Sequence, residues 1–117
     1  MTMKARMVTI DCADPDELAS WWAAAIGGTV HAVYPGWFVI VGAQPISMGF
    51  QKVPEAKMGK NRLHVDFSVE DRESTVARLV ESGATIVDTH SVPSGFTWTV
   101  LRDPVGNEFC VATDPEG

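Results

Sequence analysis

The chain has 117 residues, 45% of them hydrophobic and 21% charged, which suits one soluble globular domain spanning 1–117 without a separate catalytic module. Its formal net charge of −6 argues against a nucleic-acid partner, because nucleic-acid-binding proteins normally carry a basic patch. No apolar run approaches the roughly 20 residues of a membrane span, and residues 1–6 lack the apolar core of a signal peptide. We therefore expect a cytoplasmic protein with no membrane partner.

The chain begins with a predicted strand and helix. Residues 4–12 are expected to form a strand, and Asp14 is a good N-cap for the helix after it, with Pro15 at the first helical position. Apolar residues of this helix recur at helical spacing and predict one stripe packed on a sheet, with both tryptophans as core anchors: Leu18, Trp21, Trp22, Ala25 and Ile26. Gly27 and Gly28 end the helix.

Three short strands follow, over about 29–34, 37–41 and 46–53, separated by turns that contain Gly and Pro. The first part of the chain, about 4–53, therefore has the order βαβββ. Residues 54–61 carry charge and turn residues without periodicity and are expected to be a surface linker.

A second copy of the same plan occupies about 62–113. Residues 63–69 alternate apolar and polar side chains like residues 7–12, which predicts a strand with one buried face. A helix capped by Asp71 follows, and then strands over about 85–89, 96–101 and 107–112. The sequence thus predicts an α+β fold of two tandem βαβββ repeats, and two repeats are expected to pair into one curved mixed sheet because a solenoid needs more units.

Two features suggest a known family. The double βαβββ plan and the turn Asp103-Pro104-Val105-Gly106-Asn107 resemble the vicinal oxygen chelate superfamily, which includes glyoxalase I, bleomycin-resistance proteins and extradiol dioxygenases. The segments 11–15, 50–54, 60–64 and 107–110 look like small glyoxalase-like proteins common in actinobacteria. The resemblance implies a concave cleft on the sheet, but this superfamily supports many chemistries, so it does not transfer a function.

The resemblance also implies where a metal would bind. Superfamily metalloenzymes place ligands on the first and fourth strands of each repeat, and by alignment those positions are Met7, Gln51, His64 and Cys110. A thioether and an amide are poor ligands for a divalent ion that activates water, so we predict no metal cofactor, with His64, Cys110 and Gln51 as the remaining candidate donors. The soft pair Met7 and Cys110 could suit Cu(I) instead.

His64 is the candidate catalytic residue, with Asp66 as its neighbour on the same strand face. The two could form an acid–base pair, although two polar residues on an open strand face also fit simple solvent exposure. Cys12 and Cys110 are read as two buried thiols, since each falls in a strand and no export signal is present. His31 and His90 are read as surface residues.

The leading hypothesis is a protein that binds or sequesters a small hydrophobic or aromatic molecule in the cleft. The candidate ligand-binding residues are Met7, Trp37, Met48, Phe50, Gln51, His64, Asp66, Trp98 and Cys110. The alternative is a glyoxalase-type lyase or isomerase, or another metalloenzyme of the superfamily, that uses His64. Open strand edges and the apolar content predict a homodimer.

Overall fold

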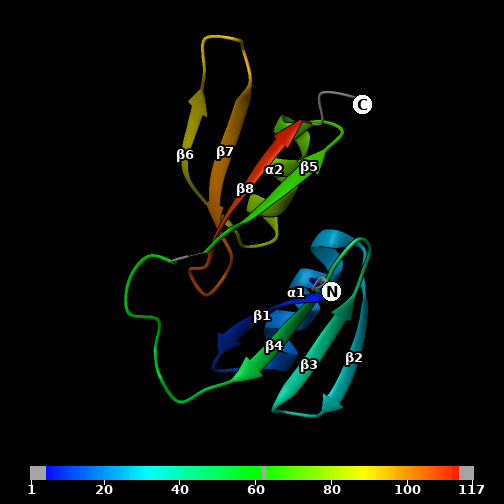
Figure 1. Cartoon of the computed structure of the whole chain (residues 1–117). Coiled ribbons are helices and arrows are strands. Elements are labelled where there is room, and N and C mark those ends of the chain that lie inside the picture. Colours follow the sequence, from blue (N-terminus) through cyan, green and yellow to red (C-terminus); the bar gives the residue numbers. More distant parts are fainter. Residues whose placement is uncertain (1–4, 62, 114–117) are drawn as a thin grey trace, which may run out of the picture. The chain divides into compact units, whose positions relative to one another are not determined.

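The computed structural model describes residues 5–61 and 63–113, in which the order β–α–β–β–β occurs twice (Figure 1). The first copy consists of β1 (Met7–Cys12), α1 (Pro15–Ile26), β2 (Thr29–Tyr34), β3 (Phe38–Gly42) and β4 (Ser47–Lys52). The second consists of β5 (Val65–Val69), α2 (Arg72–Glu81), β6 (Thr85–Ser91), β7 (Thr97–Arg102) and β8 (Glu108–Thr113). This order confirms the α+β class and the tandem βαβββ repeats.

The chain divides into two compact units, Met1–Lys57 and Met58–Gly117, and the boundary falls inside the predicted linker. Each unit contains a four-stranded sheet of its own, with strand order β1-β4-β3-β2 in the first and β5-β8-β7-β6 in the second. In both sheets the first and last strands of the repeat pair in parallel, and the remaining pairs are antiparallel. The joining of the two copies around a concave cleft stays a prediction.

Local chemistry fixes the ends of α1 as the sequence predicts. The side chain of Asp14 accepts a hydrogen bond from the backbone N–H of Glu17 at 3.2 Å, and Pro15 occupies the first turn. Gly27 ends the helix in the left-handed region with φ of 71°, where a residue without Cβ carries no steric penalty. Helix α2 is capped in the same way, because Asp71 accepts from the backbone N–H of Ser74 at 3.4 Å.

The core of the first unit lies between α1 and one face of its sheet. Its fully or largely buried residues are Leu18, Ala19, Trp22, Val39, Val41, Met48 and Phe50. Trp22 is a core residue as predicted, but Trp21 is only half-buried and meets Trp22 edge-on at 5.0 Å. The helix therefore buries the stripe that contains Leu18, Ala19, Trp22 and Ala23, which places Trp21 at its margin.

The core of the second unit lies between α2 and its sheet. Val76 and Leu79 from the helix pack with Leu101, Phe109 and Val111 from β7 and β8. The prediction that the first strand of this repeat begins at Leu63 was wrong: β5 begins at Val65, and Leu63 is 85% exposed. The reason is pairing, because the ladder with β8 begins where Val65 faces Phe109.

Candidate functional site

The second sheet has a face opposite α2, called here the open face, that gathers polar and aromatic side chains. Arg72 at the start of α2 donates a hydrogen bond to the hydroxyl of Thr99 at 2.9 Å, so Thr99 points to the helix side. Its neighbours on β7, Trp98 and Val100, must point the other way because side chains alternate along a strand. The ladder pairs Trp98 with Ala112 and Val100 with Cys110, which places Cys110 on the open face.

The first strand of the repeat adds its polar residues to the same face. Val65 and Phe67 are half-buried on the helix side, whereas Asp66 between them is exposed and pairs directly with Cys110 on β8. His64 precedes the strand by one residue and lies two residues from Asp66. Strand parity therefore explains why these three side chains meet, although His64 and Cys110 are 46 positions apart in the sequence.

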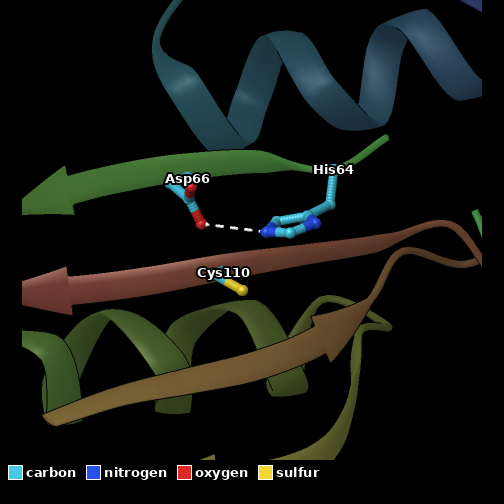
Figure 2. Close-up of side chains that lie close together, drawn as sticks. All are labelled: His64, Asp66 and Cys110. Atoms are coloured by element: carbon cyan, nitrogen blue, oxygen red, sulfur yellow. Dashed lines mark ion pairs between the residues drawn. The ribbon is translucent and has the colours of Figure 1, made fainter. Parts of the chain in front are cut away.

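The three side chains form a compact cluster (Figure 2). Nε2 of His64 lies 3.4 Å from Oδ1 of Asp66, and the side chains of these two residues are 51% and 76% exposed. The sulfur of Cys110 lies beside them, and the nitrogen, oxygen and sulfur donor atoms all fall within 4.8 Å of one another. Within residues 5–61 and 63–113 this is the one group of three such side chains close enough to hold an ion.

Cys110 is held as a neutral thiol. Burial raises its pKa from the ordinary value of 9.0, and so do the negative charge of Asp66 and a hydrogen bond with that carboxylate, while the charge of Lys60 acts in the opposite direction. A thiol with a raised pKa is a weak nucleophile at neutral pH. The cluster therefore does not present an activated cysteine.

A pocket of about 550 Å³ lies on the open face beside this cluster. Its lining consists of His64, Asp66, Phe67, Ser68, Phe96, Trp98, Cys110 and Ala112. Trp98 stacks with Phe96 at 5.9 Å between ring centroids and lies against the ring of His90 at 5.3 Å. The pocket thus has an aromatic wall on the β7 side and the His64–Asp66 pair on the β5 side.

Several predicted ligand-binding residues lie elsewhere. Met48 and Phe50 pair with Val8 and Ile10 on the helix side of the first sheet and are only 4% and 0% exposed, so they lie in the core of the first unit. Trp37 precedes β3, is 63% exposed, and lies 4.9 Å from the ammonium group of Lys52. Trp37 is two residues before Val39, which is buried on the α1 side of the sheet, so Trp37 does not lie on the opposite face.

Met7 and Gln51 do lie on the face of the first sheet opposite α1, where Gln51 pairs with Asp11. The register corrects the alignment of Gln51, however. Thr9, the counterpart of Asp66, pairs with Gly49, so Gly49 is the counterpart of Cys110. A Cβ atom on Gly49 would lie 3.0 Å from the sulfur of Met7, so this position offers neither a donor nor space for a longer side chain.

Sequence reasoning missed two aromatic contributors to the open face. His31 is exposed as predicted. His90, also expected to be a surface residue, lies with its ring tilted against that of Trp98 and 3.7 Å from the carboxylate of Asp88. Phe96 precedes β7 and completes the aromatic wall. The sequence carried a signal for His90, because Asp88 and His90 are two residues apart in a strand, as His64 and Asp66 are.

Comparison with known proteins fits this architecture. A family model described as a glyoxalase-like domain matches residues 7–112, which is most of the chain. The chain belongs to this glyoxalase-like domain family. None of the helices in the described part of this glyoxalase-like chain is long and apolar enough to cross a membrane.

Solved structures of the glyoxalase/bleomycin resistance/dioxygenase superfamily share the fold. An enzyme of this family from Burkholderia phytofirmans PsJN has a TM-score of 0.78 at 18% identity, over 92% of this chain and 95% of that one. A superfamily member from Sphaerobacter thermophilus DSM 20745 has 0.74 at 20% identity, over 97% and 98%. Lactoylglutathione lyase from Agrobacterium tumefaciens has 0.72 at 15% identity, over 97% and 95%. No curated protein matches the chain.

The metal that the superfamily implies does not fit the aligned residues. Three of the aligned ligand positions carry the thioether of Met7, the imidazole of His64 and the thiol of Cys110. The fourth, on β4 of the first sheet, is Gly49 by the strand register, which has no side chain to bind an ion. Ions such as Mn²⁺ and Mg²⁺ prefer carboxylate, carbonyl and water ligands. Only His64 is a conventional ligand among the aligned positions, so the set lacks the hard donors of a Lewis-acid centre.

Proposed function

We propose that this glyoxalase-like chain binds a small hydrophobic or aromatic molecule in the pocket on the open face of its second sheet. The observation that carries the proposal is the composition of that pocket: Trp98 and Phe96 form an aromatic wall, and His64 with Asp66 offers polar groups opposite it. A volume of about 550 Å³ lies within the roughly 300 to 1,000 Å³ usual for ligand pockets.

The polar groups orient the ligand, and the aromatic wall supplies most of the affinity. A planar ring stacked on Trp98 gains about 0.5 to 1.5 kcal/mol beyond the burial of its area. Nε2 of His64 and the carboxylate of Asp66 can exchange hydrogen bonds with a hydroxyl or amine on the same molecule. Because the thiol of Cys110 stays neutral, it serves as a soft, apolar floor rather than as a nucleophile.

A titration with 2-naphthol tests the proposal, since this probe combines two fused rings with one hydroxyl. At roughly 0.3 to 0.5 kcal/mol per non-hydrogen atom, its eleven heavy atoms give a Kd on the order of 0.1 to 5 mM by calorimetry or NMR. Trp98→Ala should weaken this binding about 2- to 12-fold, because the stacking partner is gone. The matched control is Trp37→Ala, which removes an exposed tryptophan outside the pocket and should leave the Kd unchanged.

A lyase or isomerase of the glyoxalase type is the alternative function. The observation that favours it is the contact of 3.4 Å between His64 and Asp66, which is a suitable arrangement for a base and its orienting carboxylate. An assay that measures the formation of S-lactoylglutathione from methylglyoxal and glutathione, in the presence and absence of Ni²⁺, Mn²⁺ or Fe²⁺, separates the two functions. Turnover that disappears in His64→Ala would favour the enzyme, whereas 2-naphthol binding without turnover would favour the binding protein.

We also propose a homodimer. The edge strands β2 and β6 are exposed along their whole length, and they carry apolar side chains such as Tyr34 at 67% and Ile86 at 49% exposure. Unpaired strand edges with apolar residues favour pairing with another chain, and a two-fold dimer is the commonest closed arrangement.

A further inference from the structure

The pocket on the open face carries a negative charge at Asp66. Among the residues of its lining that the structure describes, Asp66 is the one with a fixed charge, and the others are apolar, aromatic, hydroxyl, thiol or imidazole side chains. The carboxylate of Asp66 contacts Nε2 of His64 at 3.4 Å and shares a hydrogen bond with the thiol of Cys110 (Figure 2). Because neither partner has a fixed positive charge, the carboxylate is available to a cationic group of a ligand.

The surroundings of the pocket add to this negative charge. Asp88 on β6 pairs with Val100, which pairs in turn with Cys110, so its carboxylate lies on the same open face. Lys60 is the opposing basic residue, and its charge acts on Cys110 in the opposite direction to that of Asp66. Asp66 has the larger effect of the two on the pKa of Cys110, so the floor of the pocket favours a positive charge, as does the net charge of −6 of the whole chain.

We propose that the ligand of this pocket is an aryl-alkyl amine in its ammonium form, with its ring stacked on Trp98 and its ammonium group hydrogen-bonded to the carboxylate of Asp66. This inference rests on the proposed function and deepens it, because it names the class of molecule that the same pocket takes. An ammonium group is attracted to the carboxylate by charge as well as by hydrogen bonding, whereas a hydroxyl offers the hydrogen bond alone. The faces of Trp98 and Phe96 also attract a cation that lies close to them.

The spacing of the two groups sets the length of the ligand. Asp66 pairs with Cys110 on β8, and Trp98 on β7 pairs with Ala112, two residues further along β8. Two strand spacings and two residues of offset place the Cα atoms of Asp66 and Trp98 roughly 12 Å apart. The carboxylate and indole side chains cover much of this distance, so an ammonium group on a short alkyl linker can contact Asp66 while its aromatic ring lies on Trp98.

Three naphthalene probes that differ in the charge of one substituent test the inference: the ammonium form of 2-naphthylmethylamine, neutral 2-naphthol and the anion 2-naphthoate. At neutral pH and low salt, calorimetry or NMR should show the ammonium probe binding about 2- to 5-fold more tightly than 2-naphthol, and the anion less tightly than 2-naphthol. Added salt should reduce the difference between the two charged probes, because it screens exposed charges. Equal affinities of the three probes, or tightest binding of the anion, would overturn the inference and leave the proposed function standing. Absence of binding by all three would refute the proposed function as well.

Two variants assign the charge preference to one carboxylate. In Asp66→Asn the ammonium probe should lose its advantage over 2-naphthol, because the charge that attracts it is gone. The matched control is Glu73→Gln, which removes a charge of the same sign from α2, on the other side of the same sheet, and should keep the preference. The side chains of Asp66 and Glu73 are 76% and 84% exposed, so we expect both variants to fold. An unchanged preference in Asp66→Asn, or an equal loss in Glu73→Gln, would contradict the role of Asp66.

Discussion

Replacement of His64 by alanine separates binding from folding. The side chain is 51% exposed, and its charged neighbour Asp66 is 76% exposed, so the pair between them contributes only about 0.2 to 1 kcal/mol to the free energy of unfolding. In the pocket the same imidazole offers one hydrogen bond to a ligand, worth about 0.5 to 1.5 kcal/mol. We therefore expect a loss of roughly 2- to 12-fold in 2-naphthol affinity with less than about 1 kcal/mol of destabilisation.

Urea denaturation and calorimetric titration of the same protein preparation measure both quantities. His31→Ala is the matched control, because His31 is an exposed histidine on β2 in the other unit, and it should change neither quantity. Phe50→Ala is the reference for a core residue, since removal of this fully buried side chain should lower the free energy of unfolding by about 3 to 5 kcal/mol. If His64→Ala lowered the free energy of unfolding by several kcal/mol and left the affinity for 2-naphthol unchanged, His64 would be a structural residue and not a ligand-binding one.

Three further predictions concern the core, the thiol and the assembly. Trp22→Ala should lower the free energy of unfolding by about 3 to 5 kcal/mol in chemical denaturation, and Trp21→Ala clearly less, because only Trp22 is fully buried. Equal losses would contradict the assignment of Trp22 to the buried face of α1 and of Trp21 to its margin. In a Cys12→Ser background, Cys110 should react slowly with iodoacetamide at pH 8, since burial and the charge of Asp66 raise its pKa and leave less thiolate than an ordinary cysteine has. Asp66→Asn should lower that pKa and speed the reaction, and an unchanged rate would argue against the influence of the carboxylate. Sedimentation equilibrium at micromolar concentration should give twice the chain mass of 12.7 kDa, and a clean monomer would refute the dimer.

The fold was predictable because its signals are local. Alternation of apolar residues in 7–12 and 65–69, together with the caps at Asp14 and Asp71, fixed the strands and helices and exposed the repeat. The errors fall at element ends. Leu63 fits the alternation, but a strand begins where its partner allows hydrogen bonding, and that partner lies more than 40 residues away in β8.

The site was only partly predictable, since it depends on register between distant strands. The i, i+2 spacing placed His64 beside Asp66 correctly, but nothing in the sequence pairs Asp66 with Cys110. Because the register is not visible in the sequence, Met48 and Phe50 were expected in the pocket. In the structure their side chains lie on the helix side of β4 and are buried in the core.

The most direct test of a ligand site on the open face is the position of a bound probe. Intermolecular NOEs between 2-naphthol and isotope-labelled protein identify the side chains that touch the probe. We predict contacts from the naphthyl protons to the rings of Trp98 and Phe96 and to the methyl group of Ala112. Contacts confined to other surfaces, or none at a probe concentration several times the measured Kd, would contradict it.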